Sequence, residues 1–70
     1  MERQAVSSSN LASVGYDPSS ETLEVEFVTI GKVYEYYNVP QFEFDRLLEA
    51  SSVGQYFVAN IRNSYSCSPV

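Results

Sequence analysis

Residues 22–29 read TLEVEFVT, which is the clearest structural pattern in the chain. Leu23, Val25 and Phe27 alternate with side chains that are mostly charged or polar. A period of two is typical of a strand with one face on a core and the other in water. We therefore predict a strand at residues 22–29 that belongs to an antiparallel sheet.

The segments on either side predict two partner strands. Residues 11–16 alternate weakly, and residues 17–20 (DPSS) form a turn in which Pro presets one dihedral angle. Residues 30–31 (IG) allow a tight reversal, and residues 33–37 are rich in β-branched and aromatic side chains. The pattern predicts a three-stranded antiparallel β-meander.

A two-residue loop at 30–31 would fix the register of the second hairpin. It places Phe27 opposite Tyr34 and Val25 opposite Tyr36, and directly opposed residues share a face of the sheet. Both tyrosines are therefore expected on the apolar face. The other face would collect Glu24, Glu26, Val28, Val33, Glu35 and Tyr37.

Two short helices are predicted after the strands. Pro40 suits the first turn of a helix, and an apolar stripe follows at the i, i+3, i+4 positions Phe44, Leu47 and Leu48. Residues 52–55 (SVGQ) match a capping box that opens a second helix. The apolar stripe of that helix comprises Val53, Tyr56, Phe57 and Ile61.

The expected fold class is thus α+β, in the order β-β-β-α-α, with a two-helix hairpin packed on one face of the sheet. Residues 1–9 end in three serines and are interpreted as a flexible N-terminal arm. Residues 10–62 form the single domain, and residues 63–70 are interpreted as a disordered tail.

Composition excludes several classes of function. Seventy residues make one small domain, and the chain has no His and a single cysteine, Cys67, so a disulfide within the chain is impossible. We expect a cytoplasmic, non-catalytic protein with no metal, cofactor or membrane segment. The net charge of −5 opposes nonspecific attraction to nucleic acid.

An ordered series of short segments resembles the KTSC domain family. The matching segments are Val6-Ser7-Ser8, Val14-Gly15-Tyr16-Asp17, Leu23-Glu24-Val25-Glu26-Phe27, Tyr34-Glu35-Tyr36, Val39-Pro40, Leu47-Leu48, Ser52-Val53-Gly54, Tyr56-Phe57 and Ile61-Arg62. The resemblance implies a module like the one at the C-terminus of some lysyl-tRNA synthetases, which also occurs as stand-alone small bacterial proteins. RNA binding is the role suggested for the family. The chain departs from the family pattern at Phe42-Glu43, Gln55 and Val58.

Each candidate site has a structural alternative. Tyr34 and Tyr36 could stack nucleic-acid bases, or they could be core residues that pack across strands. Glu24, Glu26 and Glu35 could hold a cation, or they could form an ordinary solvated face. The candidate binding residues are Tyr34, Tyr36, Tyr37, Phe42, Val58 and Arg62.

Two functions remain open from the sequence. The first is a small interaction module that contacts an unknown protein partner or a second copy of itself. A homodimer could pair through the edge of residues 10–16, which carry no Lys or Pro to discourage edge pairing, or through Phe42 and Val58 on the helices. The alternative is an RNA-binding accessory domain, which the negative net charge disfavours.

Overall fold

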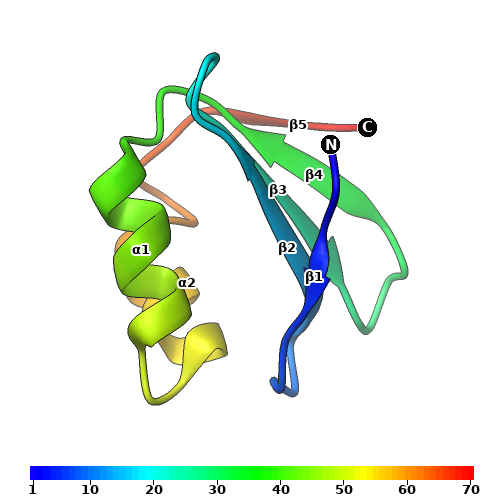
Figure 1. Ribbon diagram of the computed structural model, residues 1–70. Coiled ribbons are helices and arrows are strands. Elements are labelled where there is room, and N and C mark those ends of the chain that lie inside the picture. The colour runs from blue at the N-terminus through cyan, green and yellow to red at the C-terminus, as the bar shows by residue number, and fades with distance from the viewer.

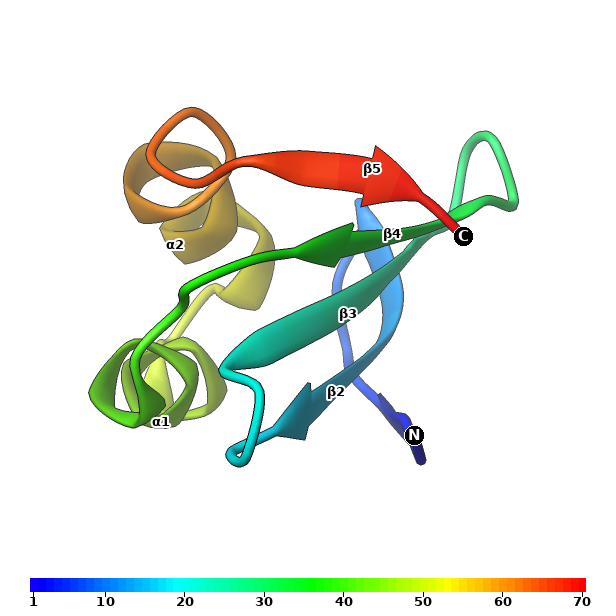
Figure 2. The same ribbon diagram turned by 90° about the horizontal axis from the view of Figure 1, so that it is seen from above.

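Strand β3 (Thr22–Phe27) lies at the centre of the sheet, as its alternating pattern predicts. The computed structural model describes residues 1–70 and shows a five-stranded antiparallel sheet in the order β1-β2-β3-β4-β5 (Figure 1). The other strands are β1 (Gln4–Ala5), β2 (Leu11–Asp17), β4 (Val33–Tyr36) and β5 (Cys67–Pro69). Helices α1 (Gln41–Glu49) and α2 (Val53–Asn60) lie together on one side of the sheet, whose strands fan out through their twist (Figure 2).

The α+β class and the helix pair are confirmed, but the number of strands is wrong in the prediction. Four strands precede the helices and a fifth follows them. The segments interpreted as a flexible arm and a disordered tail supply the two outermost strands, β1 and β5. These strands have two and three residues, which is too short to show a period in the sequence. The edge of β2 that seemed open to a second copy is paired with β1.

The register of the β3–β4 hairpin differs from the prediction by two residues. Tyr34 lies opposite Val25, and Tyr36 lies opposite Leu23. The reason is a longer loop, since the Phe27 amide bonds the Lys32 carbonyl at 2.9 Å and four residues turn the chain between them. Because side chains alternate with a period of two, an even shift leaves every residue on its predicted face. Val28 is the exception, because it lies in the loop.

A β-bulge shapes the start of β2. Leu11 pairs with Phe27 and Ser13 pairs with Glu26, so Ala12 has no partner of its own. The extra residue lets both Leu11 and Val14 point into the core, where each is fully buried.

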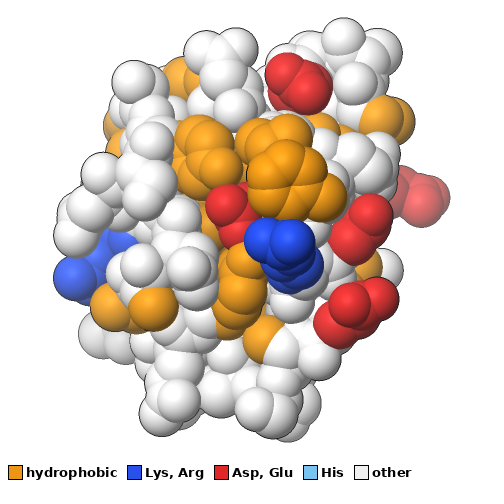
Figure 3. All heavy atoms as spheres, turned by 90° about the vertical axis from the view of Figure 1, so that its left-hand side faces the viewer, with side chains coloured by type: hydrophobic (Ala, Val, Ile, Leu, Met, Phe, Trp, Pro, Cys, Tyr) orange, Lys and Arg blue, Asp and Glu red, His pale blue; other side chains and the backbone are white.

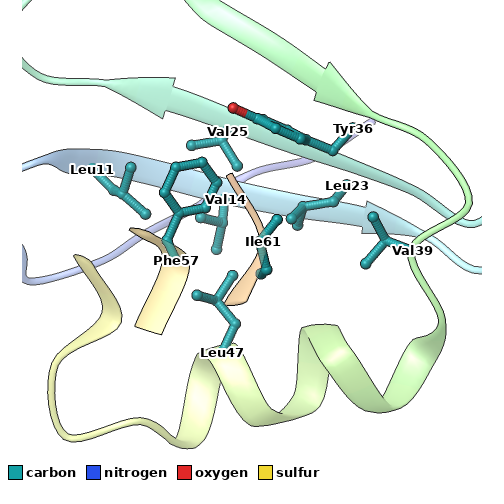
Figure 4. Packing of buried hydrophobic residues seen from close by; sticks show 9 residues of the cluster. All are labelled: Leu11, Val14, Leu23, Val25, Tyr36, Val39, Leu47, Phe57 and Ile61. Atoms are coloured by element: carbon teal, nitrogen blue, oxygen red, sulfur yellow. The ribbon is translucent and has the colours of Figure 1, made fainter. Parts of the chain in front are cut away.

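The core lies between the sheet and the two helices (Figure 4). Its buried members are Leu11, Val14, Leu23, Val25, Tyr36, Val39, Leu47, Phe57 and Ile61. Phe57 of α2 packs edge-on against Phe27 and Tyr36, with ring centroids 5.6 and 5.4 Å apart. The predicted cap of α2 is present, because the Ser52 hydroxyl oxygen accepts a hydrogen bond from the Gln55 amide at 3.2 Å. Neither helix has the length and apolar character needed to cross a membrane.

Candidate functional site

Two of the candidate binding residues, Tyr34 and Tyr36, lie on the inner face of β4. Tyr36 is 3% exposed, and burial raises its pKa to about 12, with a further increase from the neighbouring Cys67 thiol. Tyr34 is half-buried and packs edge-on against Phe27, at 5.7 Å between ring centroids. Both rings pack against core side chains, so Tyr36 in particular offers no free surface to a ligand.

The other candidate residues are dispersed. Arg62 is exposed just beyond α2, and its positive charge slightly opposes the increase in the Tyr36 pKa. Tyr37 lies on the outer face, where its hydroxyl is 2.5 Å from the Ser68 hydroxyl of β5. Val58 is 37% exposed on α2 and Phe42 is 53% exposed on α1. The structure therefore leaves Arg62, Phe42, Val58 and Tyr37 on separate segments, apart from the buried ring of Tyr36.

Phe42 is the more exposed of the two apolar candidates on the helices, and a charged side chain, Arg46, lies beside it. Arg46 lies one helical turn further along α1, and its guanidinium carbon is 5.0 Å from the centroid of the Phe42 ring. Residues at i and i+4 face each other on a helix, and a cation above an aromatic ring is attracted by its π electrons. The pair presents a flat aromatic surface and a guanidinium edge to solvent.

Glu43 lies next to Phe42 in α1 and accepts two tyrosine hydroxyls. Tyr56 of α2 donates to one carboxylate oxygen, and Tyr65 donates to the other at 2.9 Å. The hydrogen bond to Glu43 is the main cause of the raised pKa of Tyr56. Burial, followed by the bond to Glu43, raises the pKa of Tyr65 to about 12. Both oxygens of Glu43 are occupied, so this carboxylate organises the two rings.

We call the surface formed by Phe42, Glu43, Arg46, Tyr56 and Tyr65 the helix-face patch. It draws on α1, α2 and the segment that follows α2. The view onto the helix side shows an acidic and a basic side chain beside each other near its centre, with hydrophobic side chains above and below them (Figure 3). The sequence pointed to Phe42 alone, as an apolar residue outside the helical stripe. Tyr56 was assigned to the core stripe and Tyr65 to the tail.

The outer face of the sheet is different in character. Glu24 is only 7% exposed and pairs with Arg3 of the N-terminal arm at 2.5 Å. Arg3 also donates to Ser13, which in turn donates to Glu26 at 2.9 Å. The interpretation of Glu24 as part of a solvated face is therefore wrong, because the arm covers it. No group of three His, Cys, Asp or Glu side chains is arranged to hold a metal ion.

Gly15 allows the arm to lie this close. A Cβ atom at residue 15 would lie 2.4 Å from the backbone oxygen of Glu2, which is closer than any real contact. The arm therefore passes over β2 where no side chain stands in the way.

A polar hollow of about 420 Å³ separates the β1–β2 loop from the start of α2. It is lined by Ser7, Ser8, Ser9, Asn10, Ser51, Ser52, Gly54 and Gln55. With no charged or apolar side chain in its wall, it lacks the mixture of an apolar wall and oriented polar groups that typical ligand pockets have.

Comparison with known proteins now places the chain in a family. The family model described as the KTSC domain matches residues 7–65. This chain belongs to the KTSC domain family.

Small relatives and a solved structure agree with this assignment. An uncharacterised protein of Stutzerimonas stutzeri is 49% identical over 57 residues, which is 81% of this chain and 79% of the relative. The crystal structure of a KTSC domain protein from Yersinia pestis superposes with a TM-score of 0.94 at 36% identity, covering 99% of this chain and 96% of that one.

One relative is a much larger protein. A lysine–tRNA ligase of Nostoc sp. is 40% identical over 50 residues, which is 71% of this chain but 9% of the ligase. The same kind of domain therefore occurs both alone and as a small part of a larger enzyme.

Proposed function

We propose that this KTSC domain is a non-catalytic module that binds a protein partner through the helix-face patch. The observation that carries the proposal is Phe42, which leaves 53% of its surface exposed and has the guanidinium of Arg46 over its ring. Tyr, Phe and Arg are enriched at the cores of protein interfaces, and a few such residues supply most of the binding energy. A working compartment in the cytoplasm suits Cys67, which is exposed and unpaired.

Preorganisation of the patch supports the same proposal. Glu43 fixes the hydroxyls of Tyr56 and Tyr65, and Arg46 is held over Phe42. Side chains that are already ordered lose less conformational entropy when a partner binds. A catalytic role has no comparable support, since Glu43 has both oxygens occupied and the chain has no His to act as a base.

The proposal predicts that Phe42→Ala abolishes partner binding while the domain stays folded. Removing an interface anchor typically costs about 2 kcal/mol or more, which is more than tenfold in affinity. The measurement is affinity capture of the tagged protein from its own cells, comparing wild type, Phe42→Ala and the control Val58→Ala, which truncates an exposed apolar residue on the other helix. Proteins captured equally by all three would contradict the proposal. A second copy of this chain among the captured proteins would identify a homodimer.

RNA binding is the second candidate, and the match to a lysine–tRNA ligase is the observation that favours it. The small number of cations on the helix-face patch opposes RNA binding by this chain. Arg46 is the one cation of the helix-face patch, and it is stacked on Phe42, while Lys32 and Arg62 lie on other elements. Proteins that bind RNA backbones need several cations on one surface.

We therefore predict that the domain binds single-stranded RNA no more tightly than about millimolar at physiological salt, which is weaker than the roughly 10⁻⁴ to 10⁻⁶ M typical of nonspecific binding to nucleic acid. A fluorescence titration with labelled RNA of mixed sequence measures this directly. Saturation at low micromolar RNA would favour the accessory-domain function over protein binding.

A further inference from the structure

The exposed side of α1 is acidic around Phe42. Asp45 and Glu49 follow Phe42 at i+3 and i+7, so they lie along the same side of the helix, and both are exposed. Arg46 is the single cation of α1, and its guanidinium is engaged on the Phe42 ring. An approaching partner therefore meets an aromatic ring bordered by carboxylates.

The β2–β3 turn brings further acids to this side. Tyr16, next to the turn, stacks on Phe44 of α1 at 5.0 Å between ring centroids, and its hydroxyl donates to the Val39 carbonyl at 2.5 Å. Asp17 ends β2 and Glu21 lies in the turn. Burial is the main cause of the raised pKa of Tyr16, and the negative charges of Glu21, Asp45 and Asp17 raise it further. Acidic side chains of the β2–β3 hairpin and of α1 therefore lie around the same tyrosine, Tyr16.

A backbone hydrogen bond holds the β2–β3 turn in place. The Val39 amide bonds the Glu21 carbonyl at 2.9 Å, which fixes the turn beside the segment that leads into α1. The view onto the helix side shows acidic side chains along its right-hand side and hydrophobic side chains next to them (Figure 3). The other helix, α2, contributes no charged residue to this face.

We infer that the partner of the helix-face patch is a protein segment in which Lys or Arg residues flank an apolar side chain. This inference rests on the proposed function and names the chemistry of its partner. The apolar side chain packs on the exposed ring of Phe42. The flanking cations lie over Asp45 and Glu49 on one side, where complementary charge speeds association and excludes acidic partners.

Two synthetic peptides test the inference. The probe is a fluorescein-labelled peptide that alternates Lys with Leu, and the control is the same peptide with Glu in place of every Lys. We expect the lysine peptide to bind the full chain and to shift the amide NMR signals of α1, and the glutamate peptide to do neither. Binding should weaken as salt rises, because exposed charges are screened.

Charge variants locate the contact. The double variant Asp45→Asn, Glu49→Gln should bind the lysine peptide about fivefold to tenfold more weakly. The matched control is Glu2→Gln, Glu35→Gln, which removes the same charge from the arm and the outer face and should change binding by less than about twofold.

The outcomes separate the inference from the proposed function. Equal binding of both peptides, equal weakening by the two double variants, or no binding of the lysine peptide would each overturn the inference. The proposed function is judged on a different result, the dependence of partner capture on Phe42.

Discussion

Replacing Tyr36 with alanine is expected to lower the free energy of unfolding by about 3–5 kcal/mol, the usual cost of truncating a buried aromatic side chain. The ring is 3% exposed, lies opposite Leu23 in the sheet and packs edge-on against Phe57. A domain of this length is stabilised by only about 0.05–0.15 kcal/mol per residue, so the variant should lose most of its stability. Chemical denaturation followed by circular dichroism measures the change.

Tyr37 provides the matched control on the opposite face. Tyr37→Ala removes a hydrogen bond to Ser68 and should cost about 0.5–1.5 kcal/mol. If Tyr36→Ala does not fold, Tyr36→Phe keeps the ring and should remain folded. Equal losses for the two alanine variants would mean that the assignment of faces in β4 is wrong.

The sequence could predict which side chains lie on each face of the sheet, because this depends on their alternation along a strand and not on the exact pairing of residues between strands. The loop after β3 has four residues instead of two, yet the shift that results is even, and Tyr36 still points inward. A loop with one residue more or less would have reversed the prediction. The helices were predictable for a similar reason, because Ser52 and the apolar stripes encode them locally.

The terminal strands could not be predicted, because distant contacts hold them. Arg3 reaches Glu24 across 21 residues of sequence, and Tyr37 reaches Ser68 across 31. Neither segment has a local pattern that would reveal its strand. Side-chain partners of this kind become visible only when the sheet is assembled.

The candidate site was predictable only in part, for the same physical reason. Phe42 was identifiable because an apolar residue outside a helical stripe must face solvent or a partner. The bonds of Glu43 to Tyr56 and Tyr65 join residues 13 and 22 positions apart, and a carboxylate in the first turn of a helix is ordinary in sequence. The residues that hold the patch together were therefore missed.

Alkaline unfolding is the second large effect that we expect. The pKa values of Tyr36 and Tyr65 are raised to about 12, and those of Tyr16 and Tyr56 are raised as well, whereas an unfolded tyrosine titrates near 10. The folded state therefore favours the neutral phenols. Their stabilising contribution is fully present below about pH 10 and is lost as the pH rises through about 12.

For the buried ring of Tyr36, the loss of unfolding free energy per pH unit can be estimated. Between pH 10 and 12, Tyr36 is mainly ionised in the unfolded chain and protonated in the folded one, which removes about 1.4 kcal/mol of stability for each pH unit. The partly exposed tyrosines contribute less, because solvent screens their charge. Denaturation curves recorded between pH 10 and 12 should show a falling free energy of unfolding, and the folded state should be lost near pH 12.

Glu43 should cause part of the loss of stability above pH 10. Glu43→Gln removes the negative charge that faces Tyr56 and Tyr65, so the pKa values of both phenols should fall towards 10. The variant should then lose stability less steeply than wild type above pH 10, even if it is less stable at neutral pH. Glu49→Gln removes the same charge from an exposed position of the same helix and should keep the wild-type slope. Parallel slopes for wild type and Glu43→Gln would show that Glu43 does not hold the two tyrosines in solution, and the helix-face patch would lose its central organising contact.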